Sequence, residues 1–365
     1  MVFTNSTNTN TILALAPMDG VTDVAYREVV ARYGAPDLMY TEFIAVEGIV
    51  RISERLLPDF WYTPAQRPVL AQIYGNDPEL FYASTQLACE LGFDGIDINM
   101  GCPAKRVVHR GCGAGLICNP TLAKEIVFSC KRAVKDWAEG GINWKNWPVI
   151  SGDKAKKKFE SFIASSLEKP NLYADVSFSS NKKREPVPVS IKTRIGYDQP
   201  VTESWIEELL ETNPAAIAIH GRTLKQAYAG KANWGEIIKA KILRDELQMD
   251  QEERTLILGN GDIKSKEDIS PELDGVLIGR GTFGKPWVFE EIRGKTVSHN
   301  SSEVILEHVR LHELYKPERS FPQMRKNLAW YVGGFHGASE LRSKLVRSSS
   351  ATEVADILAA SALAE

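Results

Sequence analysis

Short apolar runs that alternate with helical patterns over residues 11–280 constrain the fold more than any other feature. The eight runs cover residues 11–18, 38–43, 68–74, 95–100, 187–195, 216–220, 255–258 and 275–278. Apolar runs of this length are typical of strands buried on both faces of a parallel sheet. Eight such strands alternating with helices predict an α/β fold, a (β/α)8 TIM barrel. A barrel needs about 250 residues, so a second region is expected in this chain.

Helical patterns follow most of the runs, at residues 24–30, 80–91, 120–137, 203–211, 234–247 and 266–269. The segment at about 140–188 breaks the alternation, because a barrel needs only a short turn there. We expect an insertion of roughly 40 residues, either an ordered excursion or a flexible flap. The lysines at 154–158 and 179–184 favour a solvated surface, with an RNA contact as the alternative.

The pattern becomes purely helical from about residue 300. Amphipathic stretches at 303–315, 324–332 and 339–346 are followed by a tail at 351–363. They predict a small C-terminal helical bundle domain over 300–365, after a catalytic barrel domain over 1–295. The bundle gathers the basic residues Arg325, Lys326, Arg342, Lys344 and Arg347. Ordinary surface charge and a face that binds phosphates are both consistent with this cluster.

Composition excludes several classes of protein. A net charge of -3 argues against a uniformly basic nucleic-acid binder, although a local basic patch is compatible with it. The five cysteines contain no CxxC pair, so we expect no zinc or other metal site. Residues 1–10 lack the features of a signal peptide, and no apolar run reaches the ~18 residues of a membrane span. We therefore expect a cytoplasmic, monomeric protein with reduced thiols and no membrane partner.

Cys102 lies directly after the fourth predicted strand, where α/β folds place catalytic groups. Pro103 disfavours helix at the preceding residue, so we expect the thiol on a stiff extended turn. A buried structural cysteine is the alternative, because Cys is among the most buried residue types. Asn99, Lys105 and the glycine-rich loop 110–115 beside it favour a functional thiol.

Polar side chains occur at the ends of six successive predicted strands. They are Gln72, Asn99, Lys192, Arg194, His220, Arg222, Asn260, Asp262 and Arg280. Core packing does not account for them, because an unpaired buried charge costs several kcal/mol. The pattern therefore predicts a ligand site at the carboxyl ends of the strands.

Two parts of this site are suggested by their residue types. The segments Gly259-Asn260-Gly261 and Gly279-Arg280-Gly281 follow the seventh and eighth strands, where barrels bind phosphate through backbone amides. Lys192 suits either a Schiff base or a cationic partner for an electron-rich ring. No second lysine is evident that would lower its pKa, which favours the second role.

These residues lie in motifs that resemble, in order, those of the tRNA-dihydrouridine synthases. The motifs are LAPMDGVTD at 15–23, INMGCP at 98–103, IKTRIG at 191–196, IHGRT at 219–223, GNGD at 259–262 and LIGRG at 277–281. The sequence MRKNLAWY at 324–331 is similar to the C-terminal helical domain of that family. The resemblance covers nearly the whole chain, and the segment 140–188 departs from the compact bacterial pattern.

The resemblance implies an FMN-binding barrel that is reduced by NADPH and acts on tRNA. The implied reaction reduces the C5–C6 double bond of specific uridines to 5,6-dihydrouridine. Hydride passes from N5 of reduced FMN to C6, and Cys102 protonates C5 as a general acid. This role requires Cys102 to remain a thiol, and it requires the uracil to swing out of the RNA stack.

The resemblance also assigns the remaining site residues. The implied cofactor-binding residues are Pro17, Met18, Gln72, Lys192, His220, Asn260, Gly261, Asp262, Gly279 and Arg280. The implied substrate-binding residues are Asn99, Lys105 and Arg194 around the base, and Arg325, Lys326 and Arg342 on the tRNA backbone. Gln72, Lys192 and His220 are expected to contact the isoalloxazine ring, and the residues from Asn260 onward to hold the ribityl chain and phosphate.

Three other functions are compatible with parts of the sequence. An FMN barrel acting on a free pyrimidine or an enone, as in dihydroorotate dehydrogenases or old yellow enzymes, does not need the basic helical tail. A Schiff-base aldolase would use Lys192 and would be colourless. An RNA-binding protein without catalysis would have no need for Cys102 and Lys192.

Overall fold

The structure, a computed structural model, describes residues 2–3, 11–179, 183–316 and 321–361. Within these residues eight parallel strands form a closed barrel, which confirms the predicted TIM-barrel fold. The strands are β1 (Ile12–Leu15), β2 (Leu38–Tyr40), β4 (Val69–Tyr74), β5 (Gly95–Asn99), β6 (Val189–Arg194), β7 (Ala216–His220), β8 (Leu256–Asn260) and β9 (Gly275–Ile278). Pairing of β1 with β9 and of β2 with β4 closes the ring. The two-residue strand β3 (Ile44–Ala45) pairs with β4.

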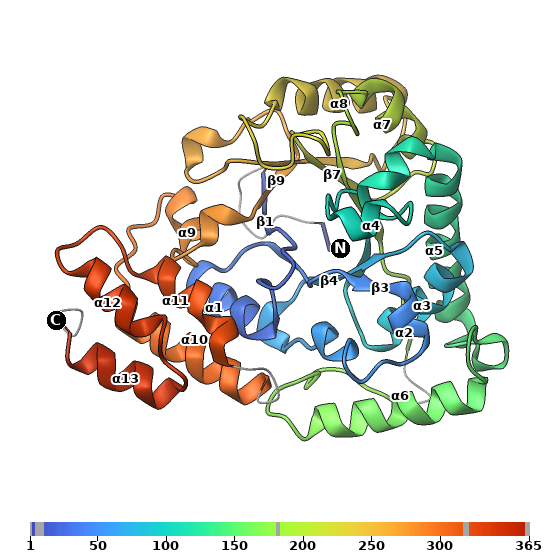
Figure 1. The fold of residues 1–365 in the computed structure, drawn as a ribbon. Coiled ribbons are helices and arrows are strands. Elements are labelled where there is room, and N and C mark those ends of the chain that lie inside the picture. The colour runs from blue at the N-terminus through green and yellow to red at the C-terminus, as the bar shows by residue number, and fades with distance from the viewer. Residues whose placement is uncertain (1, 4–10, 180–182, 317–320, 362–365) are drawn as a thin grey trace.

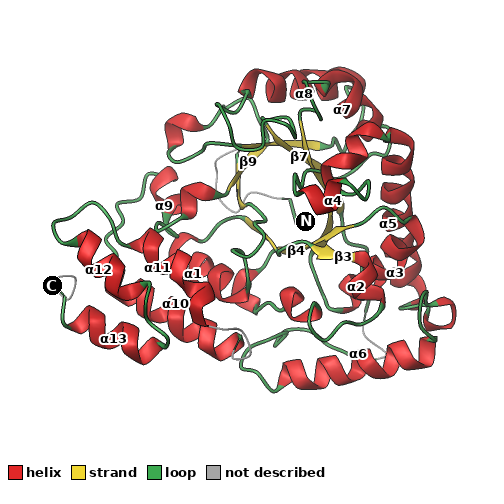
Figure 2. Ribbon diagram, viewed as in Figure 1, coloured by secondary structure: helices red, strands yellow, loops and turns green. Residues whose placement is uncertain are grey.

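Helices surround the barrel (Figures 1 and 2). They are α1 (Val24–Gly34), α2 (Val46–Val50), α3 (Pro78–Glu90), α4 (Lys105–Val108), α5 (Pro120–Gly140), α7 (Thr202–Leu210), α8 (Trp234–Leu247) and α9 (Val288–Ile292). Asp23 caps α1 by accepting a hydrogen bond from the amide of Tyr26 over 2.9 Å. Between β8 and β9 the predicted helix at 266–269 is a short 3-10 turn, Lys266–Asp268.

The inside of the barrel is a packed core. Small and aliphatic residues of several strands, including Ala14, Leu70, Ala218, Leu258 and Leu277, form an apolar cluster there. A separate, larger apolar cluster packs the outer faces of the strands against the helices. Because side chains fill the interior, a ligand can be held only above them, at the ends of the strands.

The inserted segment is an ordered excursion rather than a flap over its described residues. It contains helix α6 (Gly152–Leu167), which lies along one flank of the barrel (Figure 1). The indole of Trp147 donates a hydrogen bond to the carbonyl of Val50 over 2.7 Å. The indole of Trp61 donates to the hydroxyl of Ser166 over 2.9 Å. The exposed residues Lys154, Lys156 and Lys157 lie on the outside, while residues 180–182 of the predicted basic run lie outside the described residues.

The C-terminal helices pack on one side of the barrel (Figure 1). They are α10 (Ser301–Tyr315), α11 (Arg325–Tyr331), α12 (Ala338–Leu345) and α13 (Ala351–Ala359). Of the predicted tail at 351–363, residues 362–363 lie outside the described residues. The hydroxyl of Tyr33 on α1 donates a hydrogen bond to Glu307 on α10 over 2.5 Å. The predicted helical region therefore exists, and its division from the barrel at 295–300 stays a prediction.

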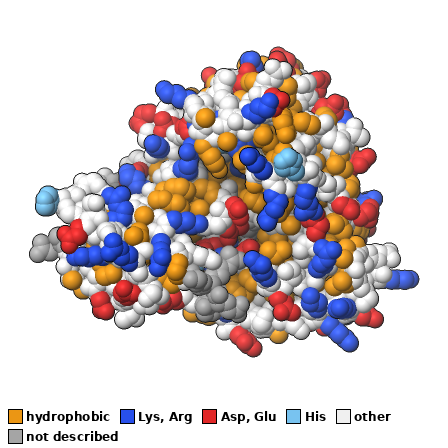
Figure 3. Space-filling model, in the orientation of Figure 1, with side chains coloured by type: hydrophobic (Ala, Val, Ile, Leu, Met, Phe, Trp, Pro, Cys, Tyr) orange, Lys and Arg blue, Asp and Glu red, His pale blue; other side chains and the backbone are white. Residues whose placement is uncertain are grey.

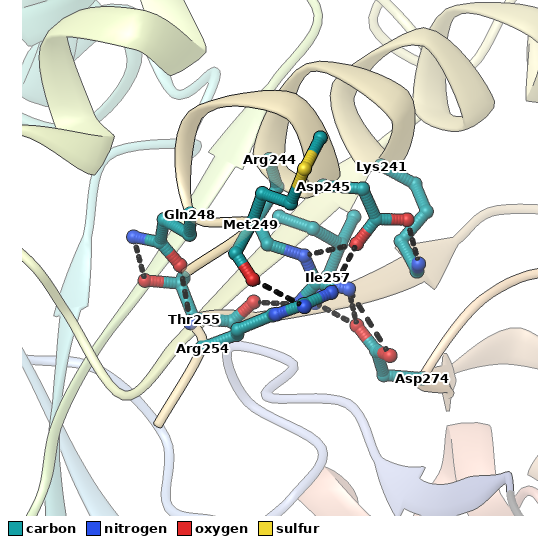
Figure 4. A network of polar contacts seen from close by, with 9 residues as sticks. All are labelled: Lys241, Arg244, Asp245, Gln248, Met249, Arg254, Thr255, Ile257 and Asp274. Atoms are coloured by element: carbon teal, nitrogen blue, oxygen red, sulfur yellow. Dashed lines mark hydrogen bonds and ion pairs between the residues drawn. The ribbon is translucent and has the colours of Figure 1, made fainter. Parts of the chain in front are cut away.

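A polar network closes the amino ends of β8 and β9 (Figure 4). Arg244 on α8 is only 3% exposed and donates to the carbonyl of Thr255 and, over 3.0 Å, to Asp274. Asp274 also accepts a hydrogen bond from the amide of Ile257 over 2.7 Å. Since these groups lie at the opposite ends of the strands from the predicted site, we assign them to stability.

Two kinds of feature are absent from the described part of the chain. No helix there is both long enough and apolar enough to cross a membrane. Among the same residues, no group of three or more His, Cys, Asp or Glu side chains is arranged to hold a metal ion. The five cysteines are all free.

Candidate active site

A cavity of about 1130 Å³ opens at the carboxyl ends of the strands. It is lined by predicted site residues from six strand ends, namely Pro17, Met18, Asn99, Cys102, Lys192, Arg194, His220, Asn260, Gly261, Asp262, Gly279 and Arg280. The volume slightly exceeds the ~300–1,000 Å³ that is usual for small-molecule sites. The structure thus brings together most of the residues that the sequence suggested.

Cys102 sits on a turn that its neighbours hold in place. The side-chain oxygen of Asn99 accepts hydrogen bonds from the amides of Cys102 and Gly101, over 2.8 and 3.1 Å. The amide of Ala114 donates to the carbonyl of Cys102 over 3.2 Å. Gly113 has a φ of +58°, and a Cβ added there would lie 3.0 Å from the carbonyl oxygen of Cys102. The glycine-rich loop can therefore pack against the thiol turn only because Gly113 lacks a side chain.

The Cys102 side chain is 7% exposed and faces the cavity. Burial raises the pKa of the Cys102 thiol above its usual 9.0, and the charges of Arg194 and Lys192 only partly oppose this. The group is therefore a protonated thiol near neutral pH. A thiol can donate a proton, whereas nucleophilic cysteines need a lowered pKa.

Lys192 lies beside Asn99 in the paired strands β5 and β6. Burial, followed by the nearby charge of Arg194, lowers the pKa of Lys192 to about 8. The sequence shows no second lysine near Lys192, and the neighbouring cation that lowers its pKa is Arg194. Residues two apart on one strand point to the same side, so the spacing of Lys192 and Arg194 could have identified Arg194 as this neighbour.

His220 is a neutral imidazole. Burial and the charges of Lys192, Arg194 and Arg222 lower the pKa of His220 to about 2. Its Nε2 atom lies 3.3 Å from a guanidinium nitrogen of Arg222. Because arginine can only donate, Nε2 accepts and the ring proton is on Nδ1.

Asp262, which follows β8, binds two arginines at the cavity, Arg222 and Arg280. It accepts hydrogen bonds from Arg222 over 2.6 Å, from the amide of Ala232 over 2.8 Å and from Arg280 over 3.1 Å. Burial opposes ionisation, but these hydrogen bonds outweigh it and lower the pKa of Asp262. Arg280 remains 50% exposed, with its guanidinium 5.1 Å from the ring centroid of Tyr228.

The backbone after β9 leaves no room for a side chain at two glycines, Gly279 and Gly281. A Cβ on Gly279 would lie 3.2 Å from the sulfur of Met18, and one on Gly281 would lie 2.3 Å from the carbonyl oxygen of Ile263. The loop after β9 therefore runs close to the cavity wall. A guanidinium that is half exposed beside such a loop suits a phosphate dianion.

Several lining residues were not among the predicted site residues. Arg222 follows His220 by two positions and was noted only as a strand-end residue, although it is buried and bonds to Asp262. Tyr228 comes from the loop after β7, where no pattern marked it. Arg194, which was among the predicted site residues, joins the loop after β7 to the thiol turn. It donates hydrogen bonds to the carbonyls of Gly101 over 2.7 Å and Ala227 over 3.3 Å.

Five predicted site residues do not line the cavity. Gln72 is fully buried among the strands, with hydrogen bonds to Asp97 over 2.6 Å and Asn99 over 2.8 Å. Lys105 is exposed at the start of α4. Lys326 donates a hydrogen bond to the carbonyl of Gly20 in the loop after β1.

The remaining two residues, Arg325 and Arg342, are exposed on α11 and α12. Figure 3 shows Lys and Arg side chains around the central hollow and over the helical region on one face of the molecule. Lys and Arg side chains thus gather around the hollow, among some Asp and Glu side chains, although the chain as a whole has a net charge of -3. This distribution suits a polyanion that spans both regions.

Comparisons with known proteins agree with this arrangement. The family model described as "Dihydrouridine synthase (Dus)" matches residues 14–138 and 160–365. The chain is similar to "Probable tRNA-dihydrouridine synthase 2" of Bacillus subtilis (strain 168), with 32% identity over 354 residues, or 94% of this chain and 92% of the relative. It is also similar to "Probable tRNA-dihydrouridine synthase" of Staphylococcus aureus (strain COL), with 31% identity over 358 residues, or 94% and 91%. The unmatched stretch falls at the start of the inserted segment.

Proposed function

The chain belongs to the dihydrouridine synthase family, and we propose that it reduces the C5–C6 double bond of specific uridines in tRNA, with FMN as cofactor and NADPH as reductant. The observation that carries this proposal is the shared cavity of Cys102, Lys192 and His220 at the strand ends. A proton donor, a cation and a neutral imidazole there suit the addition of a hydride and a proton across a double bond.

The cavity fits FMN in size and in the chemistry of its lining. Arg280 and the backbone beside Gly261 and Gly279 would hold the phosphate, because a half-exposed guanidinium lies there beside glycines at which a side chain would be crowded. Lys192 and His220 would lie against the isoalloxazine ring, where an ammonium favours negative charge. When bound, FMN would supply the hydride that adds to C6 of the uracil.

Cys102 would donate the proton that completes the reaction at C5. The raised pKa of Cys102 keeps the sulfur protonated until the substrate carbon becomes basic. After transfer, the thiolate would lie near the charges of Arg194 and Lys192, which stabilise it. General acid catalysis of this kind contributes roughly 10²- to 10⁴-fold to a rate.

The substrate is a uracil within a folded RNA, so it must leave its stack to reach the cavity. Arg325 and Arg342 are exposed on the helical region and are proposed to bind the tRNA backbone. Phosphate contacts of this type release counterions, so the affinity for tRNA should fall steeply with salt.

The proposal is tested by the absorption spectrum of the purified protein under anaerobic conditions. We expect a flavin spectrum that bleaches with NADPH and recovers when unmodified tRNA is added. If the flavin spectrum recovers at the same rate with free uridine, the substrate is a free pyrimidine rather than tRNA. A colourless protein that cannot be reconstituted with FMN would refute the proposal.

The role of Cys102 is tested by Cys102→Ala, with Cys118→Ala as the matched control because Cys118 is exposed outside the cavity. Cys102→Ala should bind FMN and tRNA and be reduced by NADPH, yet recover at least 100-fold more slowly with tRNA. Cys118→Ala should behave as the wild type. Equal recovery rates in the two variants would exclude Cys102 as the acid.

A further inference from the structure

A chain of hydrogen-bonded side chains inside the barrel leads from Asp97 on β5 to the turn of Cys102. Asp97 is fully buried and accepts hydrogen bonds from Ser190 and from the side-chain amide of Gln72, both over 2.6 Å. The side-chain oxygen of Gln72 accepts a hydrogen bond from Asn99 over 2.8 Å. The oxygen of Asn99 in turn accepts from the amide of Cys102 over 2.8 Å.

The two ends of this chain determine the orientation of both amides between them. A carboxylate can only accept, so Gln72 must turn its NH₂ group to Asp97 and its oxygen to Asn99. A backbone N–H can only donate, so Asn99 must turn its oxygen to Cys102 and its NH₂ group to Gln72. Each NH₂ group and each amide oxygen between the ends has at least one partner, and reversing either amide would place like groups together.

We propose that Asp97 is a positioning residue that acts through Gln72 and Asn99 to hold the turn of Cys102. The inference rests on the proposed function, because it assigns Asp97 to the proton-donating step. Strand register places these groups together: Gln72 lies opposite Asp97 in β4 and β5, and Asp97 lies opposite Ser190 in β5 and β6. The arrangement is thus part of the rigid barrel rather than of its loops.

Asp97 also has an electrostatic effect that must be separated from its hydrogen bonds. Its negative charge favours the protonated form of Lys192, which is proposed to contact FMN. Asp97→Ala removes the charge and the acceptor for Gln72. Asp97→Asn removes the charge but keeps an acceptor oxygen for Gln72, while its NH₂ group can donate to Ser190. Comparing these two variants therefore removes the effect of the charge and leaves that of the lost acceptor and the smaller side chain.

Ser190→Ala is the matched control for the loss of a buried hydrogen bond. Ser190 lies in the same layer and donates to Asp97, but it is not a link between Asp97 and Cys102. This variant should leave Gln72, Asn99 and the thiol turn in place. All variants are made in the full-length protein and compared as the FMN-loaded enzyme.

The first measurement is the rate at which iodoacetamide alkylates Cys102 at fixed pH, followed by peptide mass spectrometry. A loosened turn exposes a thiol that is now 7% exposed. We expect alkylation to be about fivefold faster in Asp97→Ala, which corresponds to one buried hydrogen bond. Asp97→Asn and Ser190→Ala should stay within about twofold of the wild type.

The second measurement separates the two half-reactions. Reduction by NADPH does not need Cys102, so any change should be equal in Asp97→Ala and Asp97→Asn. Reoxidation by tRNA should be about fivefold slower in Asp97→Ala than in Asp97→Asn. The same alkylation and reoxidation rates in these two variants would overturn the proposal.

The outcomes also separate this proposal from the proposed function. If the wild type is not reoxidised by tRNA, the function fails, and the alkylation rates still decide whether Asp97 positions Cys102. If Asp97→Ala does not fold, Gln72→Met removes the central link and keeps the bond between Asp97 and Ser190. Gln72→Met should then show the fivefold faster alkylation, and a rate equal to that of the wild type would overturn the proposal.

Discussion

The ring of Phe283 stacks on the indole of Trp330, with centroids 3.7 Å apart and planes 6° from parallel. Phe283 lines the cavity, and Trp330 lies on α11. On the same helix, Lys326 donates a hydrogen bond to the carbonyl of Gly20. Helix α11 therefore contacts the loops after β1 and β9, both of which line the cavity. The family resemblance implied that Lys326 contacts tRNA, and in the structure it links the helical region to a loop that lines the cavity.

We predict that Lys326→Met weakens FMN binding by about fivefold, because a hydrogen bond worth about 1 kcal/mol no longer holds the loop after β1. Flavin fluorescence titration measures this change. Arg325→Met is the control, since Arg325 is exposed on the same helix and should alter tRNA affinity but not FMN affinity. If Lys326→Met binds FMN as tightly as the wild type, the hydrogen bond from Lys326 to Gly20 does not contribute to FMN binding.

The pH dependence of reoxidation by tRNA should follow the Cys102 thiol. Burial raises the pKa of Cys102 above 9.0, so the acid form is present at lower pH and is lost as pH rises through the raised pKa. Lys192, whose pKa is lowered to about 8, also loses its proton in this direction, so we expect a rate that falls as pH rises through about 8 and falls further above pH 9. His220 adds no step near pH 6.5, because its pKa is lowered to about 2, and a step near pH 6 would instead report Asp97, whose pKa burial raises to about 6. Rapid-mixing measurements across pH test this, and a rate that rises toward pH 9 would indicate a thiolate instead.

Arg280→Met should weaken FMN binding by about tenfold, the lower end for a hydrogen bond to a charged group, because Arg280 is 50% exposed. Riboflavin lacks the phosphate, so its affinity should not change. Lys285→Met is the control, since Lys285 is exposed and does not line the cavity. Equal losses for FMN and riboflavin would contradict a phosphate site at Arg280.

Arg244→Met should lower the free energy of unfolding by about 3 kcal/mol, because it leaves the carboxylate of Asp274 without its guanidinium partner. Chemical denaturation measures this loss. Reduction by NADPH should be unchanged, since the network lies at the amino ends of the strands. Arg254→Met should change stability by less than about 0.5 kcal/mol, because Arg254 is 42% exposed and lies 3.8 Å from Asp245. If both variants lose similar free energy of unfolding, the buried pair of Arg244 and Asp274 does not stabilise the protein more than an exposed arginine does.

Much of the fold and part of the site followed from local patterns. Apolar runs of strand length predicted the barrel, and the position directly after each run predicted which side chains line the cavity. Cys102, Lys192, His220 and Arg280 could be identified because every parallel strand of a barrel ends at the same rim. The departure at 140–188 showed where a segment was inserted, but the pattern did not distinguish an ordered segment from a flap.

The sequence by itself therefore determined the eight-stranded alternation, the family motifs and the strand ends at which chemistry is placed. Only the tertiary structure decided that Asp97 connects through Gln72 and Asn99 to Cys102, that Asp262 holds Arg222 and Arg280, and that Lys326 contacts Gly20. The physical reason is that the apolar pattern of a strand and the position of its end are set by residues adjacent in the sequence. Partners across strands and domains depend instead on register and packing between segments far apart in the chain.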